Sequence, residues 1–252
     1  MGIDVRASVK RAATYAAAAA CGVLSIGAQT ASADVMQRVM RVGGASVQYK
    51  IVLPDGYDAA KAYPAVLVMG GGPQTMDTVD RTLERNFRAE AERRGYIVVA
   101  PAAPNGDLFF QGGERIFPEF LETILANHQI AGRKFHVAGP SNGGIAAMHV
   151  AAAHPSYFVS ATAFPGYLWQ PTDAKLKALR PLCVFLYVGE HDEYRWHDEM
   201  RREAQALTAA GSVARYTLEQ GQGHRLETLA DTNAGRLFDD FEEARRGCTR
   251  QP

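Results

Sequence analysis

The character of the chain changes abruptly within KFHVAGPSNGGIAAMHVAAAHP (residues 134–155). An apolar run typical of a strand ends at Gly139. An alanine-rich helical pattern follows and ends near His154, because the next residue is a proline, which disfavours helix in the residue before it. Between them, GPSNG (139–143) matches G-x-S-x-G, a pattern that is informative where it joins a strand to a helix. Such a bend carries the side chain of Ser141 to the carboxyl end of a sheet, beside the free amides of the helix.

Apolar runs alternate with helical patterns along the rest of the chain. The central runs are typical of strands buried on both faces, and the helical segments place apolar residues at helical spacing among charges. The expected strands are SVQYKIVLP (46–54), PAVLVMG (64–70), YIVVAPAAP (96–104), KFHVAG (134–139), YFVSATAF (157–164), LCVFLYVG (182–189) and ARYTLEQ (214–220), and the expected helices cover about 79–94, 114–129, 143–154, 196–210 and 233–245. This alternation predicts an α/β fold with a mostly parallel sheet and helices on both faces.

Composition agrees with one large α/β domain. The chain has 252 residues, of which 47% are hydrophobic, so it can bury a sizeable core. Lysine and arginine together number 27, as do aspartate and glutamate, so the sequence has no basic footprint for nucleic acid. We find no internal repeat and no dividing linker, and expect a single domain over residues 34–252 that ends in a short disordered tail.

The first 33 residues have the pattern of a secretory signal peptide. Basic residues from Arg6 to Arg11 precede an apolar stretch (12–27), and Ala31-Ser32-Ala33 supplies the small-residue cleavage site. The apolar stretch is short and interrupted, whereas a membrane-spanning helix needs about 20 apolar residues. We therefore expect an exported protein, periplasmic or extracellular, without stable membrane insertion. A helical or disordered arm is the alternative, and a lipoprotein signal at Cys21 is disfavoured by the apolar run that continues past it.

Two cysteines would remain after cleavage. Export would allow Cys183 and Cys248 to form a disulfide, but Cys183 lies in an apolar run and could equally be a small buried hydrophobe. The sequence leaves both readings open.

Ser141 could be a nucleophile or an ordinary helix N-cap. A serine hydroxyl is a weak nucleophile unless a base accepts its proton, so partners decide between the two. Asp192 follows three residues after the apolar run that ends at Gly189, and should therefore lie at the same edge of the sheet. Its competitors are Glu190 and Glu193, or a solvated acidic loop without catalytic role.

His224 is the best candidate for the base among seven histidines. It follows the last expected strand in GQGHRLET (221–228), an irregular loop that can reach back over the edge of the sheet. A surface loop histidine is the alternative. The order Ser141, Asp192, His224 is that of nucleophile, acid and base in one class of parallel-sheet enzymes, and it predicts a catalytic triad.

An oxyanion would need fixed hydrogen-bond donors. We expect the backbone amide of Asn142 to be one, and an amide of the glycine run at 70–72 to be the other, with Gly71 favoured over Gly72. A phosphate-binding loop is the rival interpretation, but no Lys-Ser/Thr pair follows these glycines.

With these motifs in place, the chain resembles the α/β-hydrolase superfamily, in particular secreted esterases and polyhydroxyalkanoate-depolymerase-like serine hydrolases, and it borders on prolyl-oligopeptidase-type peptidases. The matching pieces are YPAVLVMGGGP, GYIVVAPAAP, FHVAGPSNGGIAAMHVAAAHP, YVGEHDEYRW and GQGH, which together span most of residues 46–245. The resemblance implies an eight-stranded sheet and an acyl-serine intermediate, without metal or organic cofactor. Relatives often carry His-Gly where this chain has Met69-Gly70, which puts the packing of that loop in doubt.

The expected function is therefore a serine esterase acting on a small-molecule or polymeric ester. A serine peptidase that uses the same residues and a non-catalytic binding module on a hydrolase fold are the alternatives. No insertion suggests a lid, so an open site is expected. Phe109, Phe110 and Trp196 are candidate substrate contacts, because they fall in loops at the carboxyl edge of the sheet; ordinary packing in the core is at least as good an explanation for them.

Overall fold

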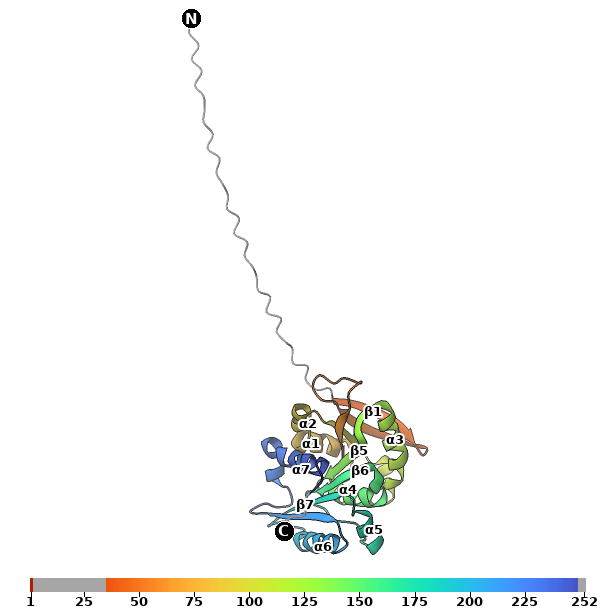
Figure 1. Cartoon of the computed structure of the whole chain (residues 1–252), viewed down its shortest axis with the longest axis vertical. Helices are drawn as coiled ribbons and strands as arrows, with labels where there is room; N and C mark the ends of the chain where they lie inside the picture. Colours follow the sequence, from red (N-terminus) through yellow and green to blue (C-terminus); the bar gives the residue numbers. More distant parts are fainter. Residues whose placement is uncertain (2–34, 249–252) are drawn as a thin grey trace. The chain divides into compact units, whose positions relative to one another are not determined.

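A computed structural model of the chain describes Met1 and residues 35–248 (Figure 1). Within these residues one eight-stranded sheet has the order β1-β2-β4-β3-β5-β6-β7-β8. β1 pairs antiparallel with β2, and β2 antiparallel with β4, whereas all other neighbours are parallel. The strands are β1 (Val35–Val42), β2 (Ala45–Val52), β3 (Tyr63–Val68), β4 (Ile97–Pro101), β5 (Ile130–Gly139), β6 (Phe158–Ala163), β7 (Cys183–Gly189) and β8 (Val213–Glu219). The predicted mostly parallel, eight-stranded sheet is confirmed.

Helices cover both faces of this sheet (Figure 1). Side chains alternate between the faces along each strand, so Leu67 of β3 belongs to the buried cluster that includes residues of α3, α4 and α6, whereas its neighbours Val66 and Val68 belong to the cluster that includes residues of α1, α2 and α7. The helices are α1 (Met76–Asn86), α2 (Arg88–Arg94), α3 (Phe117–Asn127), α4 (Asn142–Ala153), α5 (Asp173–Ala178), α6 (His197–Ala209) and α7 (Gly235–Arg245). The sequence expectation of helices on both faces is also confirmed.

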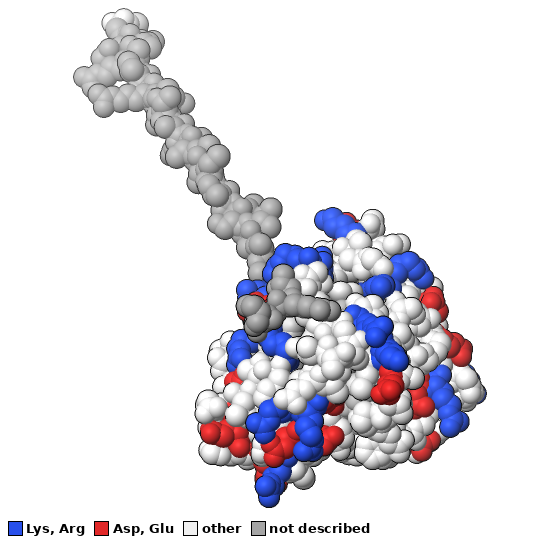
Figure 2. Space-filling view, turned by 60° about the horizontal axis from the view of Figure 1, so that its bottom comes forward, with Lys and Arg blue, Asp and Glu red and all other residues white. Residues whose placement is uncertain are grey.

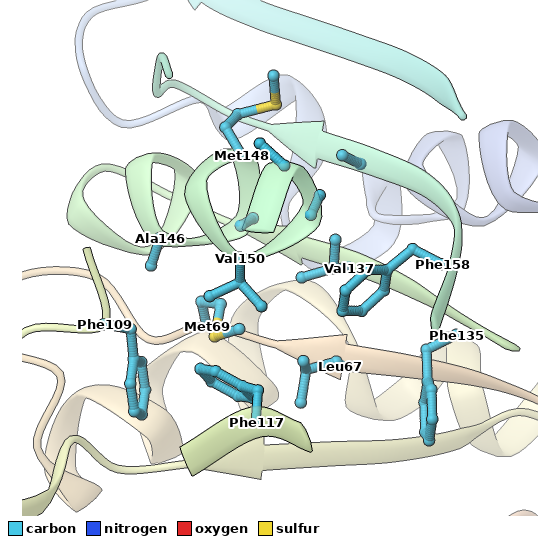
Figure 3. Close-up of a cluster of buried hydrophobic side chains, with 14 of the residues drawn as sticks. Leu67, Met69, Phe109, Phe117, Phe135, Val137, Ala146, Met148, Val150 and Phe158 are labelled. Atoms are coloured by element: carbon cyan, nitrogen blue, oxygen red, sulfur yellow. The ribbon is translucent and has the colours of Figure 1, made fainter. Parts of the chain in front are cut away.

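The alanine-rich helix α4 is buried along most of its length. A helix that is apolar on all sides belongs in the interior, and small residues let it lie close to the strands beneath it. Figure 3 shows Ala146 and Val150 of α4 directed towards Met69 and Phe117, all of them within one buried cluster. This packing fixes the amino-terminal end of α4 against the end of β3, which is where the candidate site lies.

Three features of the fold differ from the sequence reading. The single helix expected over 79–94 is two helices, α1 and α2, because the backbone leaves the helical region at Phe87 (φ −132°), whose fully buried ring packs against Phe164 and Phe238. The edge strand β1 was not anticipated, since its apolar residues are interspersed with arginine and glutamine. The short helix α5 was not anticipated either.

Cys183 of β7 and Cys248, which follows α7, form a disulfide with their Cα atoms 5.9 Å apart. The bond links the end of the described chain to the sheet. Of the two interpretations that the sequence left open, the structure has the disulfide. The expected signal peptide (1–33) and most of the expected tail lie outside the described residues.

The described surface is mixed in charge. On the face seen in Figure 2, lysine and arginine side chains are interspersed with aspartate and glutamate. Many of them pair within one helix, for example Arg93 with Glu90 in α2 and Arg202 with Glu199 in α6. No helix within residues 35–248 combines the length and the apolar character that a bilayer-spanning segment requires.

Candidate active site

Ser141 occupies a strained bend between β5 and α4. Its backbone has φ 55° and ψ −126°, a conformation that L-residues seldom adopt and that functional sites often retain. The bend brings backbone atoms too close for side chains. A Cβ added at Gly139 would lie 2.6 Å from the carbonyl oxygen of Met69, and one at Gly143 would collide with the same oxygen. Glycine at both positions therefore permits the turn.

The hydroxyl of Ser141 is directed at a histidine. Ser141 Oγ lies 2.9 Å from His224 Nε2, and although the serine stands at the N-cap position of α4, its side chain makes no capping hydrogen bond. The ordinary N-cap explanation therefore does not describe this serine.

Asp192 holds the other nitrogen of the same ring. His224 Nδ1 lies 3.1 Å from Asp192 Oδ1, and the carboxylate is buried, with only 3% of the residue exposed. Because a carboxylate oxygen accepts hydrogen bonds, the Nδ1–H group of His224 is the donor and Asp192 Oδ1 the acceptor. Nε2 is then free to accept the hydrogen bond of the Ser141 hydroxyl. The backbone amide of Tyr194 donates to the same carboxylate oxygen over 2.9 Å.

The two acidic competitors hold the backbone around the histidine. The amide of His224 donates to Glu193 Oε2 over 3.0 Å, and the amide of Gly221 donates to Glu190 Oε2 over 3.0 Å. Amide hydrogen bonds from Glu193 itself and from His224 lower the pKa of the Glu193 carboxyl. The loop after β7 thus provides one acid for the imidazole ring and two for the backbone of the loop that carries His224.

Aromatic side chains pack around the imidazole. The rings of Tyr194 and Trp196 meet His224 edge to face, with centroids 4.6 Å and 4.9 Å away, and Tyr167 packs on Trp196 in turn. Trp196, expected as a substrate contact, therefore packs on the histidine, and it is not among the residues that line the cavity at Ser141.

The glycine run after β3 lies beside the bend. A Cβ at Gly71 would lie 3.2 Å from the carbonyl oxygen of Pro140, so this loop and the residue before Ser141 are in close contact. The side chain of Asn142 donates to the carbonyl oxygen of Gly72 over 2.9 Å. Both expected donors, the amides of Gly71 and Asn142, thus belong to segments that touch at Ser141.

Gln74 is a buried residue of this loop that the sequence reading missed. It is fully buried and has φ 55°. Its side chain donates to the carbonyl oxygen of Asn142 over 3.4 Å and accepts from the amide of Phe109 over 2.8 Å, while its carbonyl oxygen accepts from the amide of Ala103. It therefore ties three segments together. A lone glutamine after a glycine run gives no sequence signal for such a role.

A cavity of about 320 Å³ opens at Ser141 and His224. Its remaining lining residues are Gly71, Gly72, Pro73, Thr78, Arg81, Thr82, Arg85, Asn86, Pro140, Phe164, Arg225 and Leu226. Phe109 and Phe110 are not among them. Phe109 is fully buried against Phe117, and Phe110 is 5% exposed and packs on Trp169. The structure thus corrects their expected place at the substrate site, because hydrophobic burial takes both rings into the core.

Within residues 35–248, no group of three or more histidine, cysteine, aspartate or glutamate side chains could hold a metal ion. The other conspicuous histidine, His136 of β5, is buried, and burial lowers its pKa to about 3. Its Nδ1 lies 2.7 Å from Ser160 Oγ, so it is a neutral residue of the core.

Comparison with solved structures identifies the fold. An S-formylglutathione hydrolase from Agrobacterium tumefaciens is 14% identical, with a TM-score of 0.65 over 87% of this chain and 99% of that one. A ferulic acid esterase is 20% identical, with a TM-score of 0.62 over 85% and 98%. A thermostable esterase is 17% identical, with a TM-score of 0.63 over 84% and 62%. At these identities the likeness establishes the α/β-hydrolase fold alone.

Sequence comparison adds a curated relative and a family. Dipeptidyl-peptidase 5 of Porphyromonas gingivalis is 30% identical over 128 residues, which are 46% of this chain and 19% of the relative, so the match covers about a fifth of the length of that protein. The profile of the family described as "Putative esterase" matches residues 42–246, which include every residue of the candidate site. The chain therefore belongs to this esterase family of α/β-hydrolases.

Proposed function

We propose that this protein is a serine hydrolase that cleaves carboxylic esters, with Ser141 as nucleophile, His224 as general base and Asp192 as the acid that orients the base. The observation that carries the proposal is the continuous chain of contacts from Ser141 Oγ to His224 Nε2 and from His224 Nδ1 to Asp192. It begins at a strained bend that opens into a cavity. Membership of an esterase family supports the choice of ester substrates.

The reaction follows from these contacts. As Ser141 Oγ attacks the ester carbonyl carbon, its proton moves to His224 Nε2. The tetrahedral intermediate collapses, the bond to the alcohol oxygen breaks, and His224 returns the proton to the departing alcohol. A water molecule then attacks the acyl-serine and gives a proton to His224, which passes it to Ser141 as the acid leaves. Asp192, already bonded to Nδ1, stabilises the imidazolium that forms in each half.

The negative charge on the carbonyl oxygen needs donors that are in place before the reaction. We assign this role to the backbone amides of Asn142 and Gly71, which belong to two segments in contact beside Ser141. Removing one such donor typically costs roughly 3–4 kcal/mol of transition-state stabilisation.

A peptidase is the second candidate. The match to a dipeptidyl-peptidase over 128 residues favours it, because the same three residues can cleave amides. The two activities are separated by comparing turnover of short p-nitrophenyl esters with that of dipeptidyl p-nitroanilides.

The experiment uses the wild type and the variants Ser141→Ala and Ser156→Ala. Ser156 is an exposed serine that follows α4, so its replacement is a matched control. We expect the wild type and Ser156→Ala to hydrolyse the esters and to be labelled by a fluorophosphonate, and Ser141→Ala to do neither. Faster cleavage of the anilides would favour the peptidase. A folded wild type that hydrolyses none of these substrates and is not labelled by the fluorophosphonate would contradict the proposal and favour a non-catalytic binding module.

We further propose that the chain is exported after cleavage near Ala33. The disulfide between Cys183 and Cys248 supports this, since such bonds persist in oxidising compartments. The mass of protein recovered from the periplasm or medium tests it: a mature chain that begins at Asp34 is expected, and an intact chain starting at Met1 contradicts it.

A further inference from the structure

One face of α1 lines the cavity at Ser141. Its lining residues are Thr78, Arg81, Thr82, Arg85 and Asn86, which are spaced as i, i+3, i+4, i+7 and i+8 and so form a single stripe of the helix. Three of the five side chains are already engaged in hydrogen bonds: Thr78 and Thr82 donate to carbonyl oxygens one turn back, and Asn86 donates to Leu229. The arginines are the members of the stripe that face an incoming substrate with charge.

The cavity wall carries more positive than negative charge. Arg225, the residue after His224, adds a third guanidinium to Arg81 and Arg85, and no aspartate or glutamate lines the cavity. Arg85 Nη2 lies 2.6 Å from Glu227 Oε2. Arg81 and Arg225 are exposed, and in the part of the chain described here neither has an ion pair or a hydrogen bond through its side chain.

The acidic residues of α1 are turned to other partners. Asp80 pairs with Lys50 of β2, and Glu84 lies 3.2 Å from Arg88 of α2. Asp77 borders a separate hollow. No acid of α1 lines the cavity or pairs with Arg81 or Arg85, although Arg81 also borders the hollow that Asp80 and Glu84 line.

The rest of the wall is apolar and the space is small. Phe164, Leu226, Pro73 and Pro140 contribute carbon surface next to Ser141. A volume of about 320 Å³ accommodates a short acyl or aryl group together with one polar end.

We infer that the ester substrate of this site carries an anionic group, such as a carboxylate, that is bound by Arg81 and Arg225 while the ester carbonyl lies at Ser141. The inference rests on the proposed function. Guanidinium groups bind carboxylates through charge-assisted, often bidentate, hydrogen bonds. A neutral substrate would leave both groups to water and gain nothing from them. The anionic group can belong to the acyl part or to the alcohol part of the ester. In both cases a negative charge lies at the end of the substrate remote from the ester bond.

Two matched pairs of substrates separate these sources. The acyl pair is p-nitrophenyl hemiglutarate, which is anionic, and p-nitrophenyl pentanoate, which is neutral. The alcohol pair is 4-carboxyphenyl butyrate and its neutral amide, 4-carbamoylphenyl butyrate. The measured quantity is the ratio of kcat/KM for the anionic member to that for the neutral member, after subtraction of the rate with Ser141→Ala.

The proteins are the wild type, the double variant Arg81→Gln/Arg225→Gln and the control Arg133→Gln. Arg133 lies near the amino end of β5, where it contacts Glu122, away from the end that carries Ser141. The substitution Arg133→Gln removes one positive charge from the protein and leaves the cavity unchanged. We expect a wild-type ratio of at least about 10 for one pair, a loss of that preference of roughly tenfold in the double variant, and no change in the control.

Salt supplies a second measurement that needs no variant. The wild-type ratio should fall as NaCl is raised to about 0.5 M, because screening weakens exposed charge pairs. Ratios near one for both pairs, or a preference that survives both the double substitution and salt, would overturn the inference and leave the esterase proposal standing. Failure of a folded wild type to hydrolyse any of the four esters would overturn both.

Discussion

Two neighbouring acids hold different parts of His224. Asp192 bonds the ring at Nδ1, whereas Glu193 bonds the backbone amide. Only the first contact fixes the tautomer in which Nε2 can accept the proton of Ser141. The difference between them is testable because both residues have isosteric amide replacements.

Asp192→Asn should lower kcat by roughly 10³–10⁴-fold, since an amide can donate to Nδ1 and so favour the wrong tautomer. Glu193→Gln keeps an oxygen that accepts from the His224 amide, so we expect a loss of about tenfold or less. Steady-state kinetics on one p-nitrophenyl ester checks both variants, with circular dichroism to establish that each is folded. Similar losses in the two variants would contradict the assignment of the orienting role to Asp192.

Glu203 of α6 is a buried acid that does not line the cavity at Ser141. Its Oε2 accepts from the amide of Leu168 over 2.7 Å, Oε1 has no hydrogen-bond partner within the described residues, and burial raises its pKa to about 8. The ordinary value is 4.5. Between these two values the unfolded chain releases the proton and the folded chain retains it, so the free energy of unfolding falls as pH rises across that window.

Glu203→Gln should therefore stabilise the protein at about pH 8 by roughly 2–4 kcal/mol and change stability little at about pH 5. The glutamine keeps the acceptor for Leu168 and cannot ionise. Urea unfolding at both pH values measures the difference, with exposed Glu84→Gln on α1 as the control, for which we expect less than about 1 kcal/mol. An equal effect of Glu203→Gln at the two pH values would show that its ionisation is not the cause.

The sequence placed the three candidate catalytic residues well because each follows a strand with a clear end. The residues after Gly139 and Gly189 had to lie at the carboxyl edge of a parallel sheet, whatever the detailed packing. Phe109 had no such constraint. Its loop position suggested exposure, but the chain folds back so that its ring packs on Phe117, and only tertiary structure reveals that.

At the scale of the element, the loop after β3 depends on one glutamine. Gln74 bonds the first residue of α4 and the amide of Phe109, and both contacts are internal to the protein. Loss of its side chain leaves buried groups without partners, each worth roughly 1–3 kcal/mol. It also frees the segment that carries Gly71. No sequence pattern signals this link, because it joins residues 68 positions apart through a single side-chain amide.

Gln74→Ala should lower the free energy of unfolding by about 2–4 kcal/mol and reduce kcat by roughly tenfold or more, as expected when an oxyanion donor is displaced rather than removed. Gln48→Ala is a matched control on an exposed part of β2 and should leave both quantities near the wild type. Urea unfolding and kinetics on a neutral ester provide the two readouts. A stability loss without any loss of kcat would mean that Gln74 supports the fold alone.

The boundary between α1 and α2 shows a different limit of sequence reading. Charges and apolar residues continue at helical spacing through 79–94, so the pattern favours one helix. The helix is interrupted at Phe87, where the backbone turns (φ −132°) and the ring packs against Phe164 and Phe238. α1 is therefore a separate helix, and the stripe that contains Arg81 and Arg85 lines the cavity.

At the scale of the whole molecule, strand order explains how distant residues meet. β3, β5, β7 and β8 run parallel, so the loops that follow them emerge at one edge and bring together the glycine run, Ser141, Asp192 and His224. Alternation of strands and helices was enough to predict this arrangement. The antiparallel pair β1 and β2 was predicted only in part, since an edge strand with mixed polarity resembles a loop in sequence.

The disulfide acts on the stability of the molecule as a whole. Cys183 lies in the central sheet and Cys248 at the end of the described chain, 65 residues apart. Closing a loop of that length lowers the conformational entropy of the unfolded chain. In the chain-entropy treatment this raises the free energy of unfolding by about 4 kcal/mol. The bond also anchors α7, which covers one face of the sheet.

Cys248→Ser should therefore lower the free energy of unfolding by about 2–4 kcal/mol, while Cys183 remains as a small buried hydrophobe. Urea unfolding of oxidised and reduced wild type alongside the variant measures this. The reduced wild type should match the variant, and reductant should leave the variant unchanged. Because Cys183 begins β7 and Asp192 follows the other end of the strand, fluorophosphonate labelling of Ser141 should persist in the folded variant. Loss of labelling before unfolding would mean that the bond also holds the site in place.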